Sequence, residues 1–209
     1  MKKLLHIIAT PRKEESRTLQ VTEAFLKVFI EKHADWVVEE LDLYKEQLPS
    51  LSQKSIDGKY LLLGGKDLSG ELKEIWQEII ACIERFKSAD AYMISAPMWN
   101  FSIPYLLKHY IDVIVQPKYL FRYTEKGVEG LIKNKKMVII TSRGGDYSLD
   151  SPAHNLDFQE PYLRAIFGLV GITQISFVAA EPMDALGPEI QAKKIEEAKI
   201  IVRKIADSF

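Results

Sequence analysis

The sequence has a single cysteine, Cys82, so the chain cannot form an intramolecular disulfide bond. This scarcity favours a reducing, cytoplasmic setting. The net charge is only -1 over 209 residues, so no overall field favours nucleic acid or an anionic membrane as a partner. No apolar run approaches the roughly 20 residues that a membrane-spanning helix needs. The four histidines show no metal-ligand spacing with one another or with Cys82, and we expect no metal site.

The composition is that of an ordinary globular protein, with 47% hydrophobic and 27% charged residues. The length suits one domain with a substantial core. Linkers, repeats and low-complexity tracts are absent from the sequence. We therefore predict a single domain over residues 1–209.

Near-continuous apolar segments predict the strands of a parallel sheet that is covered on both faces. They are residues 4–9, 89–95, 137–141 and 175–180. Residues 36–43 alternate more between apolar and polar side chains, which indicates a strand near an edge. The first segment is short and contains a histidine, so we interpret it as a strand rather than as a signal peptide.

Helical patterns alternate with these strands, at residues 16–32, 70–86, 103–114, 162–170 and 188–206. This alternation predicts an α/β, three-layer, doubly wound domain with a five-stranded parallel sheet. The spacing matches a flavodoxin-like sheet, order 2-1-3-4-5. Residues 45–69 and 116–135 have no strong period and are interpreted as long surface excursions, which are often functional when ordered.

The loop after the first strand is rich in hydroxyl groups, with Thr10, Ser16 and Thr18 ahead of a helix. Hydroxyls and the free amides of a helix start can bind a phosphate monoester. The loop contains no glycine, so it is neither a P-loop nor a dinucleotide fingerprint. A helix capped by Ser16, with the other hydroxyls solvated, fits the residues equally well.

The segment after the third strand places Met98, Trp99, Asn100 and Phe101 where a strand ends and a helix begins. In an open α/β sheet that position borders a ligand crevice. Large aromatic side chains are costly to leave exposed unless they pack against something flat, and a planar cofactor is one such partner. Core packing is the alternative for Phe101.

The strand at residues 137–141 leads into Ser142, Arg143, Gly144 and Gly145. Two glycines after a parallel strand allow close approach of a ligand to the backbone, although a plain turn has the same composition. Three strand ends of one sheet thus carry unusual loops. All three are expected on the same edge, around the switch point of the sheet.

The chain resembles the FMN-dependent NADH-azoreductase family, flavodoxin-like quinone and azo reductases once described as acyl carrier protein phosphodiesterases. The resemblance covers nearly the whole chain. It is carried by residues 96–101, 121–127, 129–131, 141–145, 161–163 and 171–173. The family usually has Tyr where this chain has Trp99, and Ser where it has Thr10.

The resemblance implies non-covalent FMN with NADH as electron donor and NADPH as a second option. The residues that would contact FMN are Thr10, Ser16, Arg17, Thr18, Pro97, Met98, Trp99, Asn100, Phe101, Ser142, Arg143, Gly144 and Gly145. The first four would hold the phosphate. Arg12 and Lys13 either add charge to that site or form a solvated face. Tyr123 is either a wall of a neighbouring subunit's pocket or an exposed aromatic of a hairpin.

The implied activity is ping-pong transfer of two electrons from NAD(P)H to quinones and aromatic azo compounds by a homodimer. The flavin carries the chemistry, so no catalytic side chain is expected. A phosphodiesterase is disfavoured because the sequence shows no metal or nucleophile constellation. The alternative is a flavodoxin-type electron carrier or flavin-binding regulator, although the net charge of -1 lacks the strong acidity of dedicated carriers.

Overall fold

A computed structural model describes all residues from 1 to 209. Its main sheet has five parallel strands in the order β2-β1-β3-β6-β7. The strands are β1 (Lys2–Ile8), β2 (Trp36–Asp42), β3 (Ala91–Ser95), β6 (Lys136–Ser142) and β7 (Gln174–Ala180). The predicted flavodoxin-like order is confirmed, and β2 lies at the edge as its alternation indicated.

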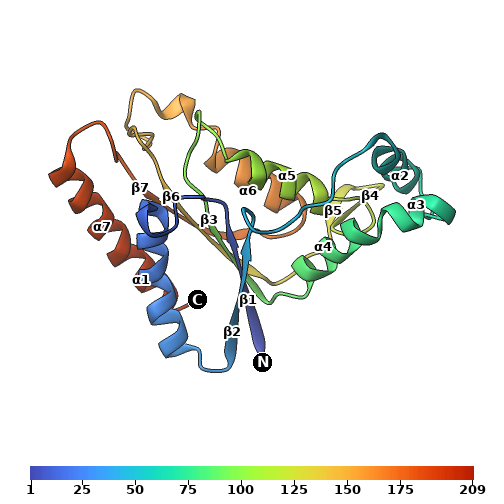
Figure 1. Cartoon of the computed structure of the whole chain (residues 1–209), viewed down its shortest axis with the longest axis horizontal. Helices are drawn as coiled ribbons and strands as arrows, with labels where there is room; N and C mark the ends of the chain where they lie inside the picture. Colours follow the sequence, from blue (N-terminus) through green and yellow to red (C-terminus); the bar gives the residue numbers. More distant parts are fainter.

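Helices cover both faces of this sheet (Figure 1). The helices α1 (Arg17–Lys32) and α7 (Pro188–Asp207) pack on one face with Leu4 and Met93 of the strands. On the other face, Leu5 and Tyr92 pack against three further helices, α4 (Gln77–Lys87), α5 (Tyr105–Ile114) and α6 (Glu160–Leu169). Neighbouring strand residues thus point to opposite faces, and because both faces are covered the strands read as continuous apolar runs.

The helix predicted over residues 70–86 is interrupted at Trp76. It consists of α3 (Gly70–Ile75) and α4, and Trp76 lies buried between them. The indole Nε1 donates a hydrogen bond to the carbonyl oxygen of Ser55 at 3.1 Å. A side chain at Gly58 would start 2.3 Å from that indole nitrogen. The segment that contains Gly58 therefore packs closely against the buried indole. The apolar stripe at residues 70–86 does not predict this contact.

Both predicted surface excursions contain regular structure. Residues 45–69 include α2 (Gln53–Leu63), whose N-terminus is capped by Ser52. Residues 116–135 include an antiparallel hairpin of β4 (Phe121–Thr124) and β5 (Gly127–Gly130). Single 3-10 turns lie at Lys13–Glu15 and His154–Leu156. No helix has the length and apolar character needed to cross a membrane.

The strand register places the starts of the three loops next to one another at one edge of the sheet. Ile8 pairs with Ser95, and Ser95 pairs with Ile140. The chain therefore leaves β1, β3 and β6 at the same edge of the sheet, as the parallel topology predicts. The candidate site is built there.

Candidate cofactor site

The first loop holds its hydroxyl groups in a hydrogen-bonded cluster. Thr10 Oγ1 donates to Ser16 Oγ at 3.3 Å, and Ser16 Oγ accepts from the amide of Leu19 at 3.3 Å. Ser16 is therefore the N-cap of α1, as one interpretation of the loop predicts, but the other hydroxyls are not solvated, because Thr10 and Thr18 are buried. The first amides of a helix have no intrahelical partner, so those of Arg17 and Thr18 are available to an anion.

The second loop is a tight turn in an unusual backbone conformation. Trp99 and Ser102 exchange two backbone hydrogen bonds of 2.9 Å. Between them Asn100 and Phe101 both have positive φ, at 48° and 68°. A positive φ is costly for a bulky side chain, and such residues cluster at functional sites. The amide of Asn100 donates to no protein atom, so this turn presents a free donor next to Trp99.

The third loop offers further free amides. The amides of Gly144 and Gly145 donate to no protein acceptor. Ser142, at the end of β6, shares a hydrogen bond of 2.8 Å with Thr18 Oγ1 of α1. This bond fastens the third loop to the start of the first helix, so that both present donors toward the same space.

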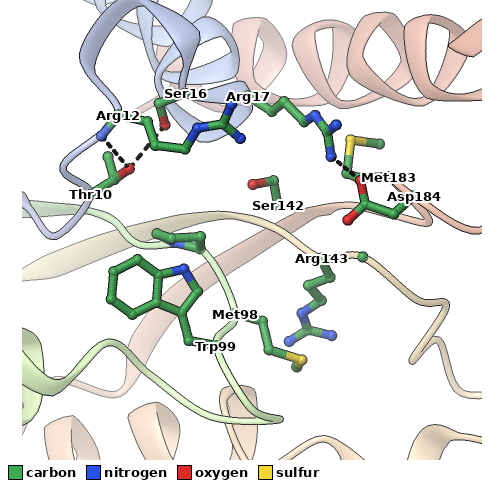
Figure 2. Close-up of a pocket in the computed structure, with 12 residues that line it drawn as sticks. Thr10, Arg12, Ser16, Arg17, Met98, Trp99, Ser142, Arg143, Met183 and Asp184 are labelled. Carbon is green, nitrogen blue, oxygen red and sulfur yellow. Dashed lines mark hydrogen bonds and ion pairs between the residues drawn. The ribbon is translucent and has the colours of Figure 1, made fainter.

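These loops enclose one cavity of about 180 Å³, called the strand-end cavity below. Figure 2 shows the lining residues around a common space, with the Arg143 side chain pointing away from Thr10 and Ser16. The lining residues are Thr10, Arg12, Ser16, Arg17, Pro97, Met98, Trp99, Ser142, Arg143, Gly144, Met183 and Asp184. Its polar end is formed by Thr10, Ser16, Arg17 and Ser142. Its aromatic end is formed by Met98 and Trp99.

A buried ionic network supports the aromatic end from below. Arg143 is almost fully buried and forms an ion pair of 2.9 Å with the buried Asp157. The Arg143 Nε donates to Gln159 Oε1 at 3.1 Å, and Gln159 Nε2 donates to the carbonyl oxygens of Ala96 and Pro97. The guanidinium is thus committed to protein partners, and any contact of Arg143 with a ligand would come from its backbone.

Glu181 is a second acidic partner of Arg143, with a separation of 3.5 Å between Nη1 and the carboxylate oxygen. Burial raises the pKa of Glu181, and the Tyr147 amide and Arg143 oppose that rise only in part. The network therefore places one cation between two carboxylates at the base of the site.

Some predicted site residues do not line the strand-end cavity. Thr18 is buried beneath it and acts through Ser142. Gly145 is absent from the lining as well, and Asn100 faces a neighbouring groove that Trp99 also lines. Phe101 is 43% exposed, so its core alternative is wrong. Tyr123, 66% exposed, lies on the β4–β5 hairpin, which Figure 1 shows well away from the carboxyl ends of β1 and β3.

Three cavity residues were absent from the predicted cofactor contacts: Arg12, Met183 and Asp184. The sequence allows Arg12 either of two roles, and in the structure it lines the cavity and pairs with Glu15 at 3.2 Å. Met183 and Asp184 follow β7. The signal that could have found them is topological, because β7 neighbours β6 and its carboxyl end reaches the same edge.

The fold and the site together define a doubly wound α/β domain that holds a ligand at the switch point of its sheet. Comparison with known proteins identifies the family. The chain belongs to the family described as flavodoxin-like fold, whose profile matches residues 2–205.

Relatives of full length are similar to the chain. An FMN-dependent NADH:quinone oxidoreductase of Nitratidesulfovibrio vulgaris is 38% identical over 209 residues, with complete coverage of both chains. One from Coprothermobacter proteolyticus is 37% identical over 210 residues, again with complete coverage. Among solved structures, an azoreductase from Bacillus anthracis is 32% identical with a TM-score of 0.90 over 100% of both chains. An FMN-dependent NADH-azoreductase from that species, solved in complex with FMN, is 29% identical with a TM-score of 0.84, covering 99% of this chain and 100% of the other.

The residues present fit FMN. The polar end gathers three hydroxyls and the positive start of α1, the donors that a phosphate dianion requires. The aromatic end supplies a sulfur and an indole, which suit a flat ring. The unpaired amide of Gly144 in the lining offers a donor for a heteroatom of such a ring, and those of Asn100 and Gly145 lie next to lining residues in the chain.

Proposed function

We propose that the protein is an FMN-dependent NADH oxidoreductase that reduces quinones and aromatic azo compounds. The observation that carries the proposal is the convergence of three strand-end loops on one cavity with a polar and an aromatic end. The names of its full-length relatives support the donor and acceptor classes. FMN, when bound, supplies the hydride acceptor and the two-electron donor of the reaction.

The chain's own residues would bind and orient this cofactor. The phosphate would lie among Thr10, Ser16, Arg17 and the first amides of α1. The ring would lie beside Met98 and Trp99, with the Asn100 amide at one edge. The amides of Gly144 and Gly145 would meet the pyrimidine edge, where fixed donors stabilise negative charge without reorganisation.

Donor and acceptor would use the same open face of the site in turn, which implies ping-pong kinetics. Trp99 is 36% exposed and also lines the neighbouring groove of about 510 Å³. It therefore stands between the proposed ring site and a space where a flat acceptor could stack. No side chain is needed as a nucleophile or general base, and NADPH remains a second donor to be tested.

A homodimer in the cytoplasm is part of the proposal. Tyr123 can form a pocket wall only for a second copy, because the hairpin that carries it does not line the chain's own cavity. We expect light scattering to give twice the monomer mass. Tyr123→Ala should then raise KM for the acceptor while the dimer persists, and a monomeric, fully active enzyme would contradict this.

The activity is tested by anaerobic stopped-flow absorbance of the FMN-loaded protein. NADH should bleach the flavin rapidly, a benzoquinone or an azo dye should restore it, and steady-state reciprocal plots should be parallel. Parallel mixing with NADPH measures the donor preference. An electron carrier of the flavodoxin type would bind FMN but would not be bleached by NADH, and that result would reject the reductase.

A further inference from the structure

An ion pair crosses the solvent side of the strand-end cavity. Arg17 Nη1 lies 2.5 Å from the Oδ1 of Asp184. Arg17 is the first residue of α1, whereas Asp184 lies between β7 and α7. Figure 2 shows this pair opposite the Thr10–Ser16 hydrogen bond, at the polar end of the same cavity.

Asp184 is fixed in this position by its backbone. Its amide donates to the carbonyl oxygen of Gly144 at 3.0 Å, and the Met183 amide donates to the same oxygen at 3.1 Å. A Cβ atom placed on Gly144 would lie only 2.9 Å from Asp184 Oδ2. Asp184 is two-thirds exposed, but its carboxylate packs against Gly144 and forms part of the cavity wall.

The sign of this carboxylate conflicts with a phosphate ligand. A phosphate monoester carries a charge of about -1.5 to -2 at neutral pH. Arg17 lies where the positive end of α1 would reinforce its attraction for such a dianion. Asp184 instead repels the dianion and already occupies one nitrogen of the Arg17 guanidinium.

We propose that Asp184 competes with the FMN phosphate for Arg17, so that FMN binding exchanges one ion pair for another. This exchange rests on the FMN site proposed above, and it adds a carboxylate that competes with the phosphate there. Before FMN binds, Asp184 holds Arg17 over the polar end. Its negative charge also lowers the protein's affinity for FMN. The pair thus makes the chain's preference for FMN over riboflavin, which lacks the phosphate, smaller than Arg17 alone would give.

The expected effects follow from the size of partly exposed charge interactions. Asp184→Asn should tighten FMN binding about fivefold and leave riboflavin binding unchanged. Arg17→Gln should weaken FMN binding by a similar factor of about five, again without changing riboflavin binding. In the double variant the gain from Asp184→Asn should shrink, because no arginine remains to be released. High salt should reduce all these differences.

The test is fluorescence titration of the full-length apoprotein with FMN and, separately, with riboflavin. Asp207→Asn is the matched control, since Asp207 is 60% exposed and pairs with Lys32 at 3.3 Å far from the cavity. It should change neither affinity. Circular dichroism confirms that each variant is folded, which the exposure of these carboxylates favours.

The outcomes separate this inference from the proposed function. Tighter FMN binding by Asp184→Asn with unchanged riboflavin binding supports the competition. Unchanged or weaker FMN binding overturns it, as does an equal effect on riboflavin, while FMN binding by the wild type leaves the proposed function standing. A wild-type protein that binds neither flavin overturns both.

Discussion

The two ends of the strand-end cavity differ in how well their side chains are buried and hydrogen-bonded in the absence of a ligand. At the polar end, Thr10 and Ser16 are buried and already hydrogen-bonded to each other. At the aromatic end, Trp99 is 36% exposed and the next two residues have positive φ. Folding therefore pairs the Thr10 and Ser16 hydroxyls before a ligand arrives, whereas the aromatic end keeps strain and exposed area that a flat ligand would use.

Each end also rests on a different kind of buried support. Beneath the polar end, His6 Nε2 and Thr22 Oγ1 both bond to Ser95 Oγ, at 2.9 and 2.7 Å, in a neutral network. Beneath the aromatic end the support is the Arg143–Asp157 ion pair. The loop at the aromatic end is thus held by charge and the loop at the polar end by neutral hydrogen bonds, and the predictions below test each support and each end.

The largest effect should come from the ionic support. Arg143→Met leaves Asp157 buried without its cation, and breaking a buried pair from one side costs about 3 kcal/mol of unfolding free energy. Urea denaturation measures the change. Arg122→Met, at an exposed arginine that pairs with Glu129 at 2.7 Å, is the control and should leave the midpoint unchanged. Equal midpoints for the two variants would show that the Arg143–Asp157 ion pair does not stabilise the fold.

The neutral support should respond to acid. Burial lowers the pKa of His6 from 6.5 to about 3. Because the folded pKa lies below the unfolded one, this contribution to stability is complete above pH 6.5 and is lost as the pH falls toward 3. Between pH 7 and pH 5 the loss should reach about 2 kcal/mol.

The measurement compares urea denaturation of the wild type and of His6→Gln at several pH values. The variant should lose less stability than the wild type over that interval, since glutamine does not titrate. Parallel pH profiles for the two proteins would show that His6 is already free to take up a proton in the folded state.

At the aromatic end, Trp99→Ala should weaken FMN and riboflavin binding alike, by about tenfold, because both ligands carry the ring that stacks there. Trp99→Tyr keeps an aromatic face and should retain most of the affinity. Acceptor profiles of the tyrosine variant show whether the tryptophan tunes substrate choice. A loss confined to FMN would mean that Trp99 acts at the phosphate instead.

At the polar end, Ser16→Ala should weaken FMN binding about fivefold and leave riboflavin binding unchanged. The same change removes the N-cap of α1 and should lower the free energy of unfolding by about 1 kcal/mol. Titration with both flavins, together with denaturation, separates the two effects. Ser148→Ala is the control, since Ser148 is exposed and lies outside the cavity lining.

The sheet could be predicted because each of its strands carries its own local signal. The apolar run at residues 4–8 and the alternation at β2 both result from burial, which the sequence records directly. The two-part helix around Trp76 could not be predicted in the same way. Its interruption lies at a buried indole whose hydrogen-bond partner, Ser55, is 21 residues earlier in the chain.

The site was predictable as three loops but not as a set of contacts. Hydroxyls, aromatics and glycines at strand ends identify the loops, and the parallel topology brings them together. Asp184 carries no such signal, since it is an exposed acid after the last strand and meets Arg17 only through the packing of β7 beside β6. The roles toward FMN of all the predicted site residues, those that line the cavity included, stay predictions.

A crystal structure of the protein grown with FMN tests the account most directly. We expect a phosphate within hydrogen-bond distance of Thr10, Ser16 and the first amides of α1, and a ring beside Trp99 with the Gly144 and Gly145 amides at its edge. FMN density at another place, or a ring at the polar end with the phosphate in solvent, would contradict it.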